Sequence, residues 1–221
     1  MSFSKEWNER YIENTHLSVW PFSDLVSYIM RYARPKKPKY SVLELGCGAG
    51  ANIPFFLSFD FIEYYGMDGS PTIIRRLRNK FPKLKENLII GDFTQNIPFQ
   101  NNFDLIVDRS ALTHNSTVAI KKCLDFVWEK LKQNGKYCGI DWFSTLHSDY
   151  KKGCETDDIF TRKGYQNGMF ADVGNVHFSD KSHLLDLFRK FDILVLEHKI
   201  IATEIPHESK SIASWNLVAK K

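Results

Sequence analysis

The stretch Val42-Leu43-Glu44-Leu45-Gly46-Cys47-Gly48-Ala49-Gly50 decides the fold of this chain of 221 residues. Its apolar first half is typical of a buried strand, and the three glycines that follow allow the backbone to turn sharply. A helix is expected directly after the turn, and the N–H groups at a helix start can meet a ligand that lies against bare main chain. The stretch therefore predicts a strand, a tight loop and a helix that bind a nucleotide-like molecule.

Apolar runs and helical patterns alternate along the chain after residue 40. We expect strands at 41–45, 62–67, 87–90, 103–107 and 137–140, and helices at 51–58, 70–81 and 117–131. Strands that alternate with helices predict a parallel sheet with right-handed crossovers. After a helix at 182–189, the runs 193–201 and 212–219 have no helix between them, which predicts an antiparallel hairpin. The fold class is therefore α/β, a mostly parallel sheet with an antiparallel edge.

The remaining segments differ in pattern. Residues 3–32 carry aromatic and aliphatic residues at helical spacing, with a break at Asn14-Thr15 and a helix start near Pro21. Residues 34–39 are rich in proline and lysine, as in a stiff linker. Residues 143–178 show no clear periodicity, and an irregular segment of this length is usually functional or disordered. We interpret it as a cover over the active site.

Composition places the protein among ordinary globular domains. The sequence is 43% hydrophobic and 14% aromatic, and its net charge of +4 is too small to indicate a nucleic-acid or membrane partner. Four cysteines lie far apart without a C-x-x-C pair, which favours a reducing compartment over a zinc site or a disulfide framework. No signal-like segment and no run of about 18 uncharged apolar residues occurs. We expect a soluble, cytoplasmic protein.

The glycine loop by itself fits two kinds of cofactor. Gly46, Gly48 and Ala51 match the dinucleotide fingerprint, and Asp68 follows near the distance expected for a ribose-binding acid. Three features separate the two alternatives: Glu44 lies before the first glycine, Gly91-Asp92-Phe93 ends the third strand, and the chain ends in a hairpin.

With these features the sequence resembles the class I S-adenosylmethionine-dependent methyltransferases of the small-molecule type, from about residue 40 to residue 221. The resemblance implies a doubly wound, seven-stranded, Rossmann-like methyltransferase fold. It also implies that Gly46, Gly48 and Gly50 cradle the methionine part, that Asp68 binds both ribose hydroxyls, and that Asp92 and Phe93 bind adenine. The other cofactor contacts that we expect are Glu44, Cys47, Asn52, Gly69, Ser70 and Asp108.

Other roles are open for several of these residues. Asp68 precedes Gly69-Ser70-Pro71 and could be a helix cap, and Gly91-Asp92 could be a strand-ending turn. Glu44 could hold the loop through backbone N–H groups or orient the methionine ammonium. The position of the acids at the ends of consecutive strands favours ligand binding, because ligands bind beyond the carboxyl ends of parallel strands.

The candidate catalytic residues follow the fourth and fifth strands. His114 is our candidate for the general base, because imidazole titrates near neutral pH, although it could instead cap a helix or orient the substrate. Asp108 is expected to form an ordering ion pair with Arg109. The predicted substrate pocket, which includes a front lid of N-terminal aromatic residues, consists of Trp7, Tyr11, Trp20, Asp141, Trp142 and His147.

No metal is expected. Asp108 and Asp141 stand where catechol-type members of the family place metal-binding acids, but Trp142 replaces the third ligand, an asparagine. The scattered residues His147, His177, His183 and Asp180 fit a zinc site poorly.

The expected function is transfer of a methyl group from S-adenosylmethionine to a small-molecule acceptor, which leaves S-adenosylhomocysteine. The alternatives are an RNA methyltransferase and a nicotinamide-dependent oxidoreductase. Asp108 is followed by Arg109-Ser110 instead of the Pro-Pro-aromatic loop of base methylation, and no substrate domain for an oxidoreductase fits the length. We expect one domain over 1–221, with a lid and linker at 1–39, a cofactor-binding half at 40–142, a cover at 143–178 and a C-terminal helix and hairpin at 179–221. The acceptor, the methylated atom and the oligomeric state stay open.

Overall fold

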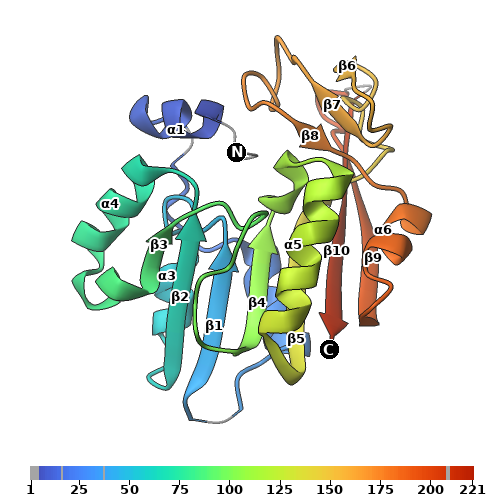
Figure 1. The fold of residues 1–221 in the computed structure, drawn as a ribbon. Helices are drawn as coiled ribbons and strands as arrows, with labels where there is room; N and C mark the ends of the chain where they lie inside the picture. Colours follow the sequence, from blue (N-terminus) through green and yellow to red (C-terminus); the bar gives the residue numbers. More distant parts are fainter. Residues whose placement is uncertain (1–4, 16, 37, 208–209) are drawn as a thin grey trace.

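The computed structural model describes residues 5–15, 17–36, 38–207 and 210–221. A seven-stranded sheet with the strand order β3-β2-β1-β4-β5-β10-β9 forms its centre (Figure 1). The strands are β1 (Tyr40–Leu45), β2 (Ile62–Asp68), β3 (Leu88–Ile90), β4 (Phe103–Arg109), β5 (Leu131–Phe143), β9 (Asp192–Ala202) and β10 (Ser211–Lys220). Strands β1 to β5 pair in parallel, and β10 is antiparallel to β5 and β9. The predicted fold class is confirmed.

Helices cover both faces of this sheet. One face carries α2 (Ser23–Tyr32), α3 (Ile53–Leu57) and α4 (Pro71–Lys80), and the other carries α5 (Thr117–Lys130) and α6 (Lys181–Leu187). Two 3-10 helices, η1 (Pro82–Asn87) and η2 (Leu112–His114), lie between strands and helices, and α1 (Lys5–Ile12) begins the described chain. Residues 3, 4 and 16 of the predicted N-terminal helical segment and residue 37 of the predicted linker lie outside the described residues.

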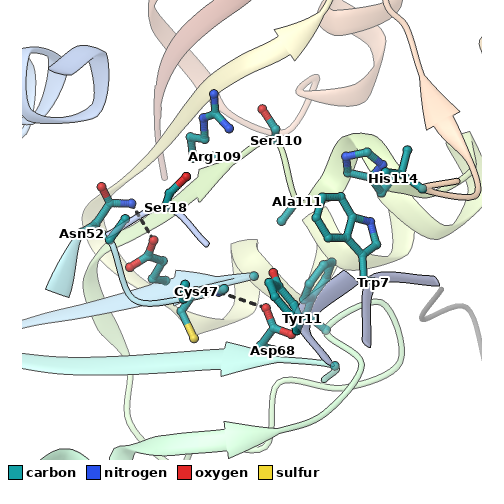
Figure 2. Close-up of a pocket in the computed structure, with 18 of the residues that line it drawn as sticks. Trp7, Tyr11, Ser18, Cys47, Asn52, Asp68, Arg109, Ser110, Ala111 and His114 are labelled. Carbon is teal, nitrogen blue, oxygen red and sulfur yellow. Dashed lines mark hydrogen bonds between the residues drawn. The ribbon is translucent and has the colours of Figure 1, made fainter. Parts of the chain in front are cut away.

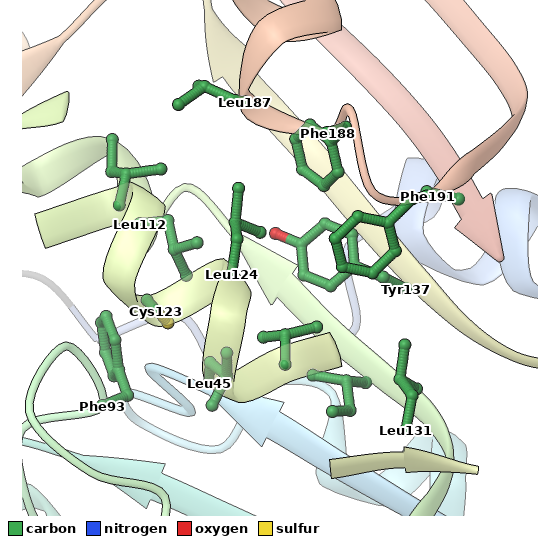
Figure 3. Close-up of a cluster of buried hydrophobic side chains, with 14 of the residues drawn as sticks. Leu45, Phe93, Leu112, Cys123, Leu124, Leu131, Tyr137, Leu187, Phe188 and Phe191 are labelled. Atoms are coloured by element: carbon green, nitrogen blue, oxygen red, sulfur yellow. The ribbon is translucent and has the colours of Figure 1, made fainter. Parts of the chain in front are cut away.

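The central strands are buried on both faces because helices cover each of them. Val42 of β1 and Leu105 of β4 pack toward α2, α3 and α4, whereas Leu43 and Ile106 pack toward α5 and α6. Figure 3 shows the second of these clusters, to which α5 contributes Leu124. Continuous apolar runs, rather than alternating ones, are the expected signature of strands buried on both sides. This alternation also sends successive side chains at the end of β4 to opposite faces.

The predicted irregularity of residues 143–178 is wrong in part. The segment contains a second, antiparallel sheet of β6 (Cys154–Glu155), β7 (Thr161–Lys163) and β8 (Val176–His177). Strands of two or three residues are too short to produce a recognisable period-two pattern, so the sequence could not reveal them. Their apolar side is a cluster of buried side chains, including Phe143, Phe170 and Phe178.

Two predicted boundaries also differ from the structure. Strand β5 begins at Leu131, directly after α5, rather than at residue 137, and Lys132 in its first part forms an ion pair with Asp104 of β4 at 2.7 Å. Helix α2 begins at Ser23, so Pro21 lies outside the helix instead of in its first turn.

The fold places two covering elements beyond the carboxyl ends of β1, β2 and β4. Figure 1 shows α1 and the β6–β8 sheet on that side of the main sheet. The chain enters the sheet at β1, adds β2 and β3 on one side, and then returns to add β4 on the other. Ligands in open α/β sheets bind at such a reversal of strand order.

Candidate active site

A cavity of about 580 Å³ lies at this reversal. Its volume falls in the range of small-molecule sites. Thirteen of the predicted site residues lie in its wall: Trp7, Tyr11, Glu44, Gly46, Cys47, Gly48, Asn52, Asp68, Gly69, Asp92, Phe93, Arg109 and His114. Seven do not: Trp20, Gly50, Ser70, Asp108, Asp141, Trp142 and His147. Figure 2 shows the cavity with its principal polar and aromatic side chains.

The glycine loop runs from the end of β1 along the floor of the cavity. The N–H groups of Gly46 and Cys47 both donate to the carbonyl oxygen of Met67, at 2.8 and 3.2 Å, which fixes the loop to β2. Gly46 has φ of +66°, and a Cβ there would lie 2.2 Å from the Cβ of Ala111, so no other residue fits. Gly50 faces away from the cavity, because a Cβ on it would lie 2.6 Å from Leu77 of α4. This position lets the loop pack closely against α4, and the contact of Gly50 with the cofactor stays a prediction.

Asp68 ends β2 and ties the loop to the start of α4. Its carboxylate accepts hydrogen bonds from the N–H groups of Gly48 at 3.0 Å and Ser70 at 2.8 Å. Burial raises the pKa of Asp68 to about 6, although both N–H groups act to lower it. The helix cap is Ser70, whose hydroxyl accepts from Ile73 N and donates to Asn8, so Ser70 is used outside the cavity.

Glu44 lies in the wall below the loop and is held by side chains. It accepts hydrogen bonds from Asn52 Nδ2 at 2.8 Å and from the Tyr64 hydroxyl at 2.6 Å. The sequence left open whether backbone N–H groups of the loop bond Glu44. In the structure its hydrogen-bond donors are these two side chains instead. Burial raises the pKa of Glu44 to about 7.

The end of β3 contributes Asp92 and Phe93. Asp92 Oδ1 accepts from the N–H group of Thr94 at 2.9 Å and from its hydroxyl at 2.6 Å. Phe93 is buried and belongs both to the cavity wall and to the core cluster beside α5. An acid and an aromatic ring thus stand together beside the loop.

Asp108 is a structural residue rather than a wall residue. Its fully buried carboxylate accepts from the N–H groups of Ala111 and Leu112, at 2.8 and 3.0 Å, and from Trp142 Nε1 at 2.8 Å and the Tyr137 hydroxyl at 3.2 Å. Burial raises the pKa of Asp108 to about 6. These four donors surround the carboxylate, and Asp108 lies outside the cavity wall, whereas the predicted cofactor contact would require it in the wall. Trp142 likewise lies in the core instead of the substrate pocket.

Arg109 pairs with Asp141 and not with Asp108, which corrects the predicted ion pair. Its Nε and Nη2 atoms lie 3.1 and 3.0 Å from Asp141 Oδ2. Side chains alternate along β4, so Asp108 points toward α5 while Arg109 lies on the face that carries α2, where Phe22 precedes that helix. Its guanidinium carbon lies 4.0 Å from the centre of the Phe22 ring.

His114 lies in η2, opposite the glycine loop. Its Nδ1 is 3.0 Å from the carbonyl oxygen of Asn175, and its ring contacts that of Trp7 with centroids 4.8 Å apart. A carbonyl oxygen accepts hydrogen bonds, so this contact assigns the proton to Nδ1 and leaves Nε2 as the nitrogen that can take up a proton.

Helix α1 covers the loop. The Tyr11 hydroxyl lies 3.0 Å from where a Cβ on Gly48 would be, and burial, together with the charge of Asp68, raises the pKa of Tyr11 well above its ordinary value. Trp20 was expected in this lid, but its side chain is 81% exposed and outside the cavity. His147 is buried among Phe143, Phe170 and Phe178, also outside the wall.

Sequence reasoning missed several polar wall residues. Ser18, Ser110 and Asn115 line the cavity, and Met169 and Val173 reach it from the cover. Ser110 directly follows β4, and its φ of +55° is the kind of strained turn found at functional sites. Ser18 stands between the apolar residues Leu17 and Val19, in a segment without a regular pattern.

Within the described residues, no three His, Cys, Asp or Glu side chains converge to form a metal site. None of the helices in the described part of the chain has the length and apolar character that crossing a membrane requires.

Comparison with known proteins defines the class. A family model described as a methyltransferase domain matches residues 42–135, which include the glycine loop, Asp68, Asp92 and the end of β4. Residues 42–135 are thus similar to a methyltransferase domain, and the fold of the chain is that of the class I S-adenosylmethionine-dependent methyltransferases. The resemblance drawn from the sequence is confirmed.

Several solved structures share this fold over nearly the whole chain. A SAM-dependent methyltransferase from Methanosarcina mazei is 16% identical, with a TM-score of 0.68 over 91% of this chain and 98% of its own. TehB from Haemophilus influenzae is 18% identical, with a TM-score of 0.62 over 97% of this chain and 67% of its own. Magnesium protoporphyrin IX methyltransferase from Synechocystis, with bound SAH, is 16% identical, with a TM-score of 0.59 over 90% of this chain and 80% of its own. No curated protein matches the chain.

Proposed function

We propose that the protein is an S-adenosylmethionine-dependent methyltransferase that acts on a small-molecule acceptor. One observation carries the proposal: the glycine loop, Asp68, and Asp92 with Phe93 all line one cavity, although they come from the ends of three different strands. The methyltransferase-domain match covers the same residues.

The charges of the cavity wall fit this cofactor. Three acids, Glu44, Asp68 and Asp92, face one basic residue, Arg109. S-adenosylmethionine is a cation with two ribose hydroxyl donors and an adenine amino donor, and carboxylates are the strongest acceptors for such groups. Asp68 would hold the ribose, Asp92 and Phe93 the adenine, and the bare main chain of the loop the methionine part.

Orientation is the main task of the protein in this reaction. When bound, S-adenosylmethionine supplies an electrophilic methyl group whose leaving group is a neutral thioether. The wall residues Phe143, Met169 and Phe170 would align an acceptor with an apolar body, and alignment alone can supply roughly 7–11 kcal/mol of the barrier. A cavity covered by α1 and the β6–β8 sheet suits a small molecule better than a polynucleotide.

The proposal includes the organisation and location expected from the sequence. We assign the lid to residues 1–39, the cofactor-binding half to 40–142, the cover to 143–178 and the C-terminal part to 179–221. All four cysteines are free thiols, and three of them are buried, which suits a reducing cytoplasm.

Replacement of Asp68 tests cofactor binding. We expect Asp68→Ala to weaken binding of S-adenosylhomocysteine by several kcal/mol, because charged hydrogen bonds contribute about 1.5–3 kcal/mol each. Isothermal titration calorimetry measures the change, and Asp60→Ala, an exposed acid before the other end of β2, is the matched control. Unchanged affinity would reduce Asp68 to a loop-fixing residue. Tight NAD binding without any response to S-adenosylhomocysteine would contradict the proposed function.

Replacement of His114 tests the general base. We expect His114→Ala to lower kcat by about 10²- to 10⁴-fold on an acceptor that must lose a proton, with cofactor affinity unchanged. The acceptor is first found by screening metabolites with methyl-labelled cofactor. Full turnover by the variant would assign His114 to packing against Trp7.

A further inference from the structure

Arg109 is the one lysine or arginine among the described residues of the cavity wall. Its guanidinium is held on two sides. Asp141 Oδ2 lies on the edge that carries Nε and Nη2, at 3.1 and 3.0 Å, and the Phe22 ring lies against one face at 4.0 Å from the guanidinium carbon. The side chain is still 35% exposed, and no described residue accepts a hydrogen bond from Nη1. A fixed guanidinium therefore keeps an edge with donors for a ligand.

The ion pair with Asp141 does not use up the positive charge of Arg109. Asp141 Oδ1 also accepts from Lys199 at 2.6 Å, so one carboxylate serves two cations. Lys199 in turn bonds Asp24 at 2.6 Å, so the cluster holds two cations and two carboxylates. A singly charged anion suits this partly compensated cation better than a dianion does.

The position of Arg109 identifies the end of the cavity at which the anion would lie. Leu45 pairs with Asp108 across β1 and β4, so Arg109 follows beside Gly46 at the start of the glycine loop. Figure 2 shows Arg109, Ser18 and Asn52 on one side of the cavity, and His114 with Trp7 on the other. Asn52 links Phe22 to Glu44 on this side of the cavity. Its Oδ1 accepts from Phe22 N at 3.1 Å, and its Nδ2 donates to Glu44 at 2.8 Å.

We propose that Arg109 binds a carboxylate at this end of the cavity. The planar donor edge of a guanidinium matches a carboxylate, and an arginine held in advance loses little entropy on binding. Glu44, an acid on the same side, makes the end complementary to a group that carries both an ammonium and a carboxylate. This inference rests on the proposed function, and the carboxylate belongs either to the amino-acid part of the cofactor or to the acceptor.

Calorimetry with two nucleosides distinguishes these sources. S-adenosylhomocysteine carries the amino-acid carboxylate, and 5′-methylthioadenosine lacks it. If the cofactor supplies the carboxylate, Arg109→Gln weakens S-adenosylhomocysteine by about tenfold to a hundredfold and leaves 5′-methylthioadenosine unchanged. Arg109→Lys, which keeps the charge without the planar edge, recovers part of the loss. Arg31→Gln, which removes a guanidinium stacked on Tyr28 and Tyr32 outside the cavity, changes neither affinity.

A second experiment tests whether the acceptor supplies the carboxylate. Wild type and Arg109→Gln, each saturated with S-adenosylhomocysteine, are titrated with phenylacetate and with its neutral analogue phenylacetamide. If the acceptor supplies the carboxylate, wild type prefers the acid at least tenfold and the variant loses the preference, while both nucleosides bind as before.

Two results overturn the inference. One is unchanged affinity for both nucleosides together with the same ratio of acid to amide affinity in wild type and variant. The other is an equal loss for both nucleosides, which marks Arg109 as a structural residue. Failure of the proposed function gives a different result, because the wild-type protein then binds neither nucleoside. In that case the titrations with phenylacetate and phenylacetamide are run without S-adenosylhomocysteine, and they test the role of Arg109 by themselves.

Discussion

Burial raises the pKa of three carboxyl groups at the ends of neighbouring strands, to about 7 for Glu44 and to about 6 for Asp68 and Asp108. Their surroundings separate their roles. Asp108 is enclosed by four donors and holds the turn after β4, whereas Glu44 and Asp68 have two partners each and also face the cavity. Wall carboxylates with raised pKa values are stabilised in their charged form when a cation arrives, which suits a cationic ligand.

Replacement of Glu44 changes the pH dependence of stability. In the folded protein Glu44 keeps its proton up to a pH of about 7, whereas the unfolded chain releases it near 4.5. The free energy of unfolding therefore decreases as the pH rises through this window. We expect Glu44→Gln to remove this decrease, so that the variant gains more than about 1 kcal/mol relative to wild type between pH 5 and pH 8.

Urea unfolding at a series of pH values measures this difference. Glu63→Gln, an exposed acid on β2, is the control and should follow wild type at every pH. If the free energy of unfolding depends on pH in the same way for Glu44→Gln and for wild type, the folded protein does not hold the proton on Glu44.

At the scale of elements, the cover is attached to the main domain through a helix start. Asp158, between β6 and β7, accepts hydrogen bonds from the N–H group of Thr117 at 2.6 Å and from its hydroxyl at 2.9 Å, at the first residue of α5. The same carboxylate bonds the Thr161 hydroxyl at 2.8 Å. Burial acts to raise the pKa of Asp158, but these hydrogen bonds together hold it below its ordinary value. One side chain thus joins the small sheet to α5.

Removal of this carboxylate loosens the cover. We expect Asp158→Ala to lower the free energy of unfolding by about 1–3 kcal/mol, the cost of leaving its buried donors without an acceptor. It should also increase hydrogen exchange in β7 and β8. Asp157→Ala, the exposed neighbour, should do neither. If hydrogen exchange in β7 and β8 is as slow in Asp158→Ala as in wild type, the aromatic cluster alone holds the cover.

At the scale of the whole molecule, α1 joins the two halves that enclose the cavity. Arg76 of α4 donates to the Tyr11 carbonyl oxygen at 2.9 Å and to Asn14 Oδ1 at 2.8 Å, which fixes the end of α1 to the cofactor-binding half. On the other side, Arg10 forms an ion pair with Asp172 of the cover at 3.7 Å. We therefore expect ligand entry and release to involve movement of α1.

Weakening this attachment should speed ligand release. We expect Arg76→Ala to raise the dissociation rate of S-adenosylhomocysteine roughly threefold to tenfold, because exposed contacts contribute about 1 kcal/mol. Thermal stability without ligand should change little. Stopped-flow displacement measures the rate, with Arg75→Ala, the exposed neighbour on α4, as control. Equal rates for both variants would mean that α1 does not limit release.

Local sequence was sufficient for the sheet and for the floor of the cavity. Each strand from β1 to β4 is an apolar run bounded by turn residues, and the glycines of the loop are required by backbone geometry that no other residue adopts easily. Asp68 and Asp92 could be placed because each directly follows its strand. The short strands β6, β7 and β8 could not be, since their pairing depends on contacts rather than on periodicity.

What the sequence by itself determined is the wound sheet and the meeting of three strand ends at one edge, because these follow from patterns within a few residues. Only the tertiary structure decided the roles of Asp108 and Arg109. They are adjacent in the chain, but the pleat of β4 sends one into the core and leaves the other in the wall, and their partners Trp142, Asp141 and Phe22 lie about 30 to 90 residues away. Whether a side chain lines the cavity or supports its wall from the core depends on such distant neighbours. These residues come into contact only in the folded protein.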